Sequence, residues 1–370
     1  MIAALVFSCI DPFAPKINST DSNILVVNGY LDASTGSATI QLSRSTNIAD
    51  VLSSPAELKA TVTISSSGGI IYQFIEQGGG DYLATNIKID AQQSYTLKIL
   101  TKDGEQYSSV AEPVKTTPSI DSVSWVVDSF NSAVAIKVNT HDPQNNTRYY
   151  QWDFVETWEY QTKYNSSYEY VGNTIVPRTK DISRCYKSAT NQAIIVGSST
   201  KLSLDVIRDF QINSISQSSA KLARRYSILV KQHALTREAY EYWSVLKNNS
   251  ESLGSLYAPI PSQLVGNISN INNKSIPVIG YFSIYSVQEK RIFIKNSQLP
   301  KNIISQTGYE SCQSNSIDLK DLPLPASYLF LTPIYVPFPP PTIIGYEVVN
   351  AGCADCRLAG GSITVPDFWN

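Results

Sequence analysis

The sequence has 370 residues, a length typical of two or three domains, and its 42% hydrophobic content is high enough to build buried cores. Charged residues make up only 16% of the chain, and the formal net charge is −2. This balance excludes an extended basic surface of the kind that attracts nucleic acid or anionic lipid.

The first nine residues have the character of the end of a secretion signal. Small and apolar residues stop at Cys9, and a polar, proline-containing stretch follows. We expect cleavage before Cys9, which leaves residues 1–8 as a signal-peptide remnant and residues 9–23 as a lipidated tether. The first basic residue is Lys16, so the expected translation start lies upstream. The alternative is a buried N-terminal strand with a free thiol. Beyond residue 9, no apolar run approaches the ~20 residues of a membrane helix.

Residues 24–117 carry a series of short segments with β-strand character, separated by turn residues. Asp103-Gly104 is a strong signal for a tight hairpin, and Pro113 and Pro118 mark the end of the series. Short strands at this spacing predict an immunoglobulin-like or transthyretin-like β-sandwich. The expected strands lie at residues 24–31, 38–43, 60–65, 70–74, 81–85, 94–100 and 106–110.

Residues 118–310 predict a second, larger β domain with one docked helix. Thr236 is a candidate N-cap for a helix over residues 236–248. An apolar stripe at helical spacing would dock this helix on a sheet, formed by Ala239, Tyr242, Trp243 and Leu246. The expected strands of this domain include residues 122–127, 133–139, 227–232, 281–286 and 290–295.

One segment of the second domain is unusually aromatic. From Arg148 to Tyr164, about 17 residues alternate between aromatic and polar, which predicts a long two-faced strand that turns back through residues 168–171. An aromatic face is most often a core face. However, strands usually run about five or six residues, so a core is too short to cover all of this one. We therefore expect the part beyond Glu156 to project and to contact a partner or ligand through Trp158, Tyr160 and Tyr164.

Residues 311–370 predict an irregular, cross-linked tail, because several prolines interrupt any long regular element. Four cysteines remain after Cys9, and an even number in an exported chain predicts two disulfides with three possible pairings. One option joins Cys353 to Cys356 and Cys185 to Cys312. The other pairs the tail with the body over a long range, and we favour it. A four-thiolate zinc site is the rival interpretation, although Cys353 and Cys356 supply only half of the usual spacing.

Several segments together resemble the Bacteroidota surface lipoprotein family catalogued as domain of unknown function 4249. They keep their order along nearly the whole chain. The matching segments are Leu25–Tyr30, Ile40–Ser45, Ala60–Ile64, Tyr95–Leu97, Pro118–Ser122, Cys185–Tyr186, Tyr240–Trp243, Gly266–Ile268, Gly280–Phe282, Cys353–Gly361 and Pro366–Trp369. The resemblance implies a surface lipoprotein that is often encoded beside a TonB-dependent transporter. It implies no substrate and no active site.

Motifs of enzyme chemistry are weak in this sequence. His141 and His233 are the two histidines, and neither lies in a catalytic motif. A catalytic pair of carboxylates leaves no local pattern in a sequence, so the sequence does not exclude such a pair among Glu156, Glu159 and Glu169. A glycosidase is therefore a third hypothesis. The loop 142–146 is more simply a polar turn than a calcium site. We expect no metal and no cofactor.

The sequence thus predicts a mainly all-β, lipid-anchored protein of the outer membrane, exposed at the cell surface. Its expected function is non-enzymatic accessory binding, in which it captures or gates a ligand with a TonB-dependent transporter. The main alternative is a scaffold lipoprotein of an envelope assembly or secretion complex. A carbohydrate-active enzyme is the remaining hypothesis.

Overall fold

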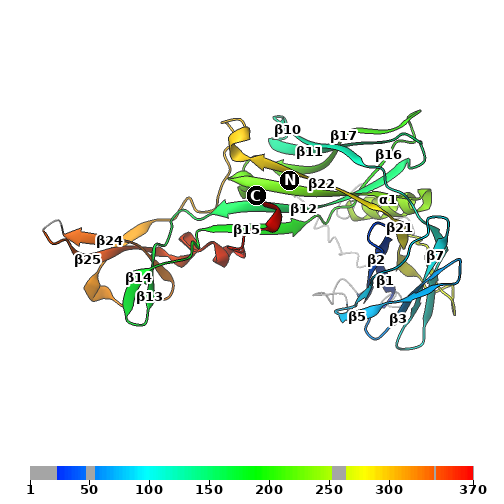
Figure 1. Ribbon diagram of the computed structural model, residues 1–370, viewed down its shortest axis with the longest axis horizontal. Helices are drawn as coiled ribbons and strands as arrows, with labels where there is room; N and C mark the ends of the chain where they lie inside the picture. The colour runs from blue at the N-terminus through cyan, green and yellow to red at the C-terminus, as the bar shows by residue number, and fades with distance from the viewer. Residues whose placement is uncertain (1–22, 47–54, 252–263, 337–338, 370) are drawn as a thin grey trace, which may run out of the picture. The chain divides into compact units, whose positions relative to one another are not determined.

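The computed structural model describes residues 23–46, 55–251, 264–336 and 339–369. Cys9, the signal-peptide remnant and all but Asn23 of the expected tether lie outside these ranges. The fold is mainly β, as predicted, with the single α-helix of the described residues at α1 (Arg237–Glu251). The chain forms two compact units (Figure 1), of which unit 1 comprises residues up to Val114 and residues from the range Gln263–Ile284. Unit 2 comprises residues from Lys115–Ser262 and Tyr285–Asn370.

Unit 1 is a β-sandwich, as the short alternating segments predict. Its two sheets supply alternate inward side chains, such as Leu25, Ile40, Ile64 and Leu97, to one buried cluster. The first sheet has the order β20 (Val278–Gly280), β1 (Leu25–Asp32), β2 (Ser37–Arg44), β6 (Asp81–Ala84), β5 (Ile75–Gly78), and β21 (Ser283–Tyr285) also pairs with β1. The second has the order β19 (Ile268–Asn270), β8 (Gln106–Ser109), β7 (Ser94–Leu100), β3 (Thr61–Ser66), β4 (Ile71–Gln73), with β9 (Glu112–Pro113) on β7.

The segments of the chain that form unit 1 differ from the predicted continuous domain 24–117. The unit ends at Val114 and takes in a second piece of chain, residues 264–284, which the sequence placed in the second domain. In this piece β20 pairs with β1 and β19 pairs with β8, while Phe282 is fully buried in the core of the sandwich. Strand pairing between segments so distant in sequence has no local signature, which is why the sequence did not reveal it.

The body of unit 2 consists of two sheets that pack around one core. In one sheet β10 (Ile120–Asp128), β11 (Ala133–Asp142) and β17 (Asp205–Ser216) lie in that order. The other has the order β15 (Arg184–Thr190), β12 (Tyr149–Gln161), β18 (Arg225–Ala234), β22 (Val287–Lys295), and β16 (Ile195–Ser198) also pairs with β12. Side chains of both sheets, including Ile136, Trp152 and Ile228, form one buried cluster.

The predicted helix is confirmed as α1, two residues of which are buried, Ala239 and Tyr242. Thr236 is its N-cap, because its Oγ1 accepts a hydrogen bond from the Ala239 N–H at 3.1 Å. The ring of Tyr240 lies 5.0 Å from that of Tyr149, centroid to centroid, at the start of β12. Across the described ranges, no helix is both long enough and apolar enough to cross a membrane.

A third sheet of unit 2 corrects two expectations. It has the order β14 (Thr174–Pro177), β13 (Tyr168–Val171), β24 (Tyr328–Val336), β25 (Thr342–Asn350), β23 (Ser314–Asp318). Residues 168–171 therefore do not turn back onto the aromatic strand, whose partner at that end is β15. The expectation of an irregular tail is also wrong, because β24 and β25 are both nine residues long. Pro333 is tolerated at a register shift of the β24–β25 pair.

Candidate functional site

Two disulfides fasten the C-terminal tail of unit 2. Cys185 in β15 is bonded to Cys356, and Cys312 is bonded to Cys353, with Cα–Cα distances of 5.7 and 5.8 Å. The favoured long-range pairing of the tail with the body is confirmed for Cys185–Cys356, whereas Cys312–Cys353 joins two residues of the expected tail, and a Cys353–Cys356 bond is excluded. A thiol in a disulfide cannot ligate zinc as a thiolate, so the rival four-cysteine zinc site is wrong. Among the described residues, no group of three or more His, Cys, Asp or Glu side chains is placed to hold a metal ion.

The fastened tail covers the aromatic strand that was expected to project. Tyr160 is only 8% exposed, and its hydroxyl donates to the Cys356 carbonyl at 2.6 Å. Trp158 and Tyr164 are half-buried, and both pack against buried clusters of unit 2. The expected exposure of these three rings is therefore wrong. The reason is that the chain supplies a cover from a segment 196 residues further on.

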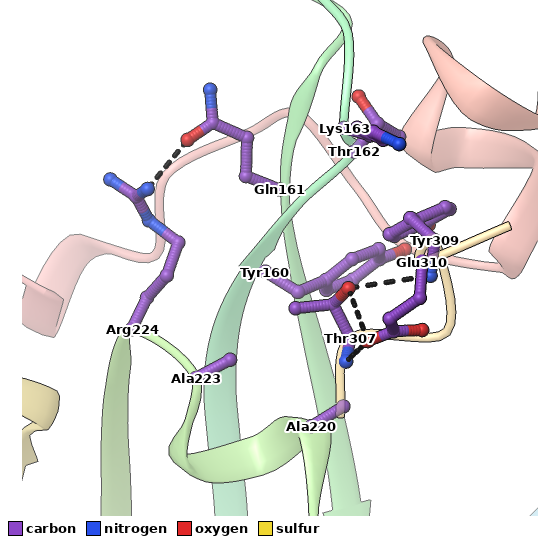
Figure 2. A pocket seen from close by; sticks show the side chains of 10 residues that line it. All are labelled: Tyr160, Gln161, Thr162, Lys163, Ala220, Ala223, Arg224, Thr307, Tyr309 and Glu310. Carbon is purple, nitrogen blue, oxygen red and sulfur yellow. Dashed lines mark hydrogen bonds between the residues drawn. The ribbon is translucent and has the colours of Figure 1, made fainter. Parts of the chain in front are cut away.

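Tyr160 nevertheless contributes to a pocket in unit 2. The pocket has a volume of about 330 Å³ and lies where the end of β12 meets the short 3-10 helix η3 (Ala220–Leu222) and the loop before Cys312 (Figure 2). Small-molecule sites commonly occupy about 300–1,000 Å³, so this is a compact example. Its lining residues are Tyr160, Gln161, Thr162, Lys163, Ala220, Ala223, Arg224, Thr307, Tyr309 and Glu310.

The side of the pocket formed by β12 and η3 is charged and internally paired. The Arg224 guanidinium donates through Nε to Glu159 Oε1 at 2.8 Å and through Nη1 to Gln161 Oε1 at 2.5 Å. Lys163 Nζ donates to the Cys312 carbonyl at 2.6 Å. These contacts hold both cations in place, so this wall is formed before any ligand arrives.

The opposite side is the turn from Thr307 to Glu310. The Glu310 carboxylate accepts hydrogen bonds at Oε1 from Thr307 N, Thr307 Oγ1 and Gly308 N, and backbone N–H groups of this turn lower its pKa. Tyr309 is half-buried, and burial raises the pKa of its phenol, as it does for Tyr160. Both phenols are therefore neutral hydrogen-bonding groups at physiological pH.

Tyr160 forms the floor between these two sides. Figure 2 shows its ring between Ala220 and Ala223 on one side and Tyr309 on the other. Behind it lie Cys185 and Cys356, which share a buried cluster with Tyr160 against which Tyr309 packs. One disulfide therefore supports the floor, and the other begins two residues after Glu310.

The candidate acids on β12 do not form a catalytic pair. Glu156 and Glu159 are three positions apart, an odd offset, and therefore point to opposite faces of the strand. Glu156 accepts from Tyr226 Oη at 2.7 Å and pairs with Lys221 Nζ at 2.5 Å, whereas Glu159 pairs with Arg224. Glu169 lies in β13 and pairs with Arg178 at 3.0 Å. Each carboxylate has its own cation, which is the arrangement of structural ion pairs.

The two histidines also lie apart from the pocket lining. His141 lies in β11 and contacts Asp121 at 2.8 Å, whereas the fully buried His233 lies in β18 and contacts Asp153 at 2.8 Å. These two strands belong to different sheets. In the loop 142–146, the Asp142 carboxylate accepts from the N–H groups of Gln144, Asn146 and Thr147. This is the polar turn that we expected in place of a calcium loop.

Sequence reasoning found one side of this pocket and missed the other. Tyr160 was proposed as a contact residue, but Arg224 and residues 307–310 carry no motif. They meet β12 only through tertiary folding. The one available signal was the position of Tyr309 and Glu310 directly before Cys312, a cysteine expected to fasten the tail.

Comparison with known families and proteins gives one positive result. The family model described as Domain of unknown function (DUF4249) matches residues 10–291, about three quarters of the chain. The match includes Tyr160 and Arg224 and stops before the turn 307–310. No curated protein shows a significant match.

Proposed function

The chain belongs to the family DUF4249, and from this premise we propose that it is a lipid-anchored surface protein that binds a ligand beside a TonB-dependent transporter. In this proposal Cys9 carries the lipid, and the pocket at Tyr160 captures the ligand or gates its entry. The protein acts by binding and not by catalysis. A separate ion pair for each of the three glutamates, and the placement of the two histidines in different sheets, support this choice.

The observation that carries the proposal is the preformed pocket. Its charged wall is held by the Arg224 contacts with Glu159 and Gln161. The Cys185–Cys356 bond lies behind the Tyr160 floor, and the Cys312–Cys353 bond holds the chain next to the turn 307–310. A site that is ordered in advance loses less conformational entropy when its ligand binds. Disulfides of this kind persist in oxidising compartments, which agrees with an exported protein.

A second candidate function, an envelope scaffold without a small ligand, is favoured by the surface of the third sheet of unit 2. Five large apolar side chains there are substantially exposed, namely Tyr170 at 40%, Val171 at 55%, Tyr328 at 38%, Tyr335 at 50% and Ile344 at 44%. Tyr170 and Val171 are consecutive in β13 and point to opposite faces of the sheet, so apolar side chains are exposed on both faces, and such exposure is common at protein interfaces. The same surface would serve a transporter as partner, so the identity of the partner distinguishes the two functions.

Purification of the native complex tests the proposal. We expect a TonB-dependent barrel to co-purify with the tagged wild-type protein, and the double variant Tyr170→Ser with Tyr335→Ser to lose it. A matched control is Ile70→Ser with Ile71→Ser, which changes exposed residues of unit 1 instead. Co-purification of secretion or envelope-biogenesis components without a barrel would support the scaffold and contradict the transport role.

The lipid anchor has its own test. Cys9→Ser, introduced into the gene with its complete signal sequence, is expected to move the protein from the membrane fraction to the soluble fraction, because the acyl chains provide the attachment. The measurement is fractionation with detection by an epitope tag. Retention of the variant in the outer membrane with unchanged gel mobility would contradict the anchor.

A further inference from the structure

We propose that the pocket at Tyr160 takes a single neutral sugar ring, a hexose or an N-acetylhexosamine. This inference rests on the proposed ligand-binding function and specifies the ligand class for the same site. Three properties of the pocket lead to it: its aromatic surface, its balance of charge and its mixture of hydrogen-bond donors and acceptors.

The aromatic surface comes from Tyr309 and Tyr160. A pyranose ring presents C–H groups on its face and hydroxyls at its edge, so it matches a site in which a phenol ring meets polar side chains. Tyr309 is half-buried against the cluster that holds Tyr160 and the Cys185–Cys356 bond. Across the ranges that the structure describes, no hydrogen bond reaches the Tyr309 hydroxyl, so this group is available to a ligand.

The balance of charge favours a neutral ligand. The lining holds two cations, Arg224 and Lys163, and one anion, Glu310. The charge of Arg224 is already paired with Glu159, which lies outside the lining and also contacts Arg184 at 3.6 Å. The Arg224–Glu159 pair is tight, at 2.8 Å, and the Glu159 side chain is only 11% exposed. An anionic ligand would have to compete with Glu159 for the guanidinium, and a cation would meet Lys163.

The hydrogen-bonding groups suit hydroxyls, which both donate and accept. A guanidinium has five N–H donors, and two of those of Arg224 are placed on Glu159 and Gln161. The three hydrogen bonds from Thr307 and Gly308 converge on Glu310 Oε1, so Oε2 can accept from a ligand. Tyr309 Oη can do either. The volume of about 330 Å³ accommodates one ring with its substituents.

Saturation-transfer NMR on the full-length mature protein in detergent, followed by titration, tests the inference. The probes are glucose, galactose, mannose and N-acetylglucosamine, with glucuronate and N-acetylneuraminate as charged counterparts. We expect at least one neutral sugar to bind. Tyr309→Phe should weaken its affinity by about two- to tenfold, the effect of one hydrogen bond. Ala223→Phe, which fills the pocket without removing a polar group, should abolish binding.

The matched control is Tyr335→Phe, which removes a hydroxyl from an exposed tyrosine of the third sheet and should leave the affinity unchanged. The inference is overturned if none of the neutral sugars binds, if only the two acids bind, or if Tyr309→Phe binds like the wild type. If Ala223→Phe fails to fold, the sugar affinity of Tyr309→Phe alone tests the inference. Co-purification of a barrel without sugar binding rejects this inference alone, whereas Tyr309-dependent sugar binding without a barrel rejects only the transporter partnership.

Discussion

At the scale of single residues, Gly361 sets how closely the tail approaches the pocket floor. A Cβ atom at this position would lie 2.2 Å from Tyr160 Oη and 2.8 Å from the Cys185 Cβ, both distances too short for non-bonded atoms. Tyr160 cannot move away freely, because its hydroxyl is bonded to the Cys356 carbonyl. Only a glycine therefore fits between the floor and the tail.

Gly361→Ala is expected to destabilise unit 2 by about 1–3 kcal/mol, the usual effect of overpacking a core. For a domain of this size, that corresponds to a fall of several degrees in the melting temperature. The measurement is thermal unfolding by circular dichroism. Gly352→Ala is the control, since a Cβ there meets only Asn350 Oδ1, at 3.4 Å. Equal melting temperatures for the two variants would show that the floor and the tail are less tightly packed than described.

Asp355 links the stability of the tail to pH. The Arg357 side chain donates to it at 2.9 and 2.7 Å, and this hydrogen bonding holds the pKa of the Asp355 carboxyl below its usual value, although burial acts in the opposite direction. A lowered pKa means that the fold favours the carboxylate. The contribution is complete above about pH 5 and is lost as the pH falls through the folded-state pKa.

Asp355→Asn should therefore cost stability at pH 7 and little at low pH. The loss is expected to be less than about 1 kcal/mol, because Arg357 is half-exposed and Asn still caps the following 3-10 helix. The measurement is the urea midpoint of wild type and variant at pH 7 and at about pH 3. A difference between the two proteins that grows as the pH falls would contradict the assigned direction.

At the scale of elements, the C-terminal segment from Cys353 to Trp369, called the strap below, passes over the end of β12. Its 3-10 helix η7 (Cys356–Ala359) is joined to β15 by the Cys185–Cys356 bond, and its last described turn, η8 (Asp367–Trp369), packs on the neighbouring strands. There the Arg225 guanidinium lies 5.2 Å from the Trp369 ring centroid, and Arg291 lies 3.5 Å from that of Phe368. The terminal Pro-Asp-Phe-Trp segment is thus a structural fastening.

Removing either disulfide is expected to loosen this strap. The bonds close loops with sequence separations of 171 and 41 residues. If a disulfide acts by lowering the entropy of the unfolded chain, the two bonds stabilise the folded state by at most about 5 and about 4 kcal/mol, respectively. The variants Cys185→Ser with Cys356→Ser, and Cys312→Ser with Cys353→Ser, should each lower the denaturant midpoint and speed tryptic cleavage of the tail.

The wild type treated with a reductant serves as the reference for these two variants. It should be the least stable of the three, because it lacks both bonds. An unchanged midpoint in both double variants would show that the tail is held by packing alone.

At the scale of the whole molecule, the chain leaves unit 1 after Val114 and returns to it at residues 264–284. The returning segment adds β19 and β20 at the outer edges of the two sheets and places Phe282 and Ile284 in the core. Unit 1 therefore depends on a segment that follows α1, about 150 residues after Val114.

A fragment of residues 24–117 alone is therefore expected to fold poorly. Without the returning segment, the edges of β1 and β8 lose their partners and part of the core is exposed, which promotes aggregation. The same fragment joined to residues 264–284 by a flexible linker should regain a cooperative unfolding transition. The measurements are thermal unfolding and binding of a hydrophobic dye. Cooperative unfolding of both fragments would show that the first piece is a complete domain.

The sequence by itself determined the local structure of this protein. Alternation of apolar and polar residues specified the strands of the sandwich, and Thr236 with its apolar stripe specified the helix, because side-chain period and capping depend only on near neighbours. The even number of cysteines indicated two disulfides, and the spread of matching segments indicated the family.

Only the tertiary structure decided which surfaces are covered. The sequence could not show that Tyr160 lies beneath Cys356, that residues 264–284 complete the first sandwich, or that Arg224 and Glu310 line the same pocket. Each of these contacts joins segments far apart in the chain. Such pairings depend on which long-range arrangement buries the most apolar surface and satisfies the most polar groups, and that comparison is made by the whole fold.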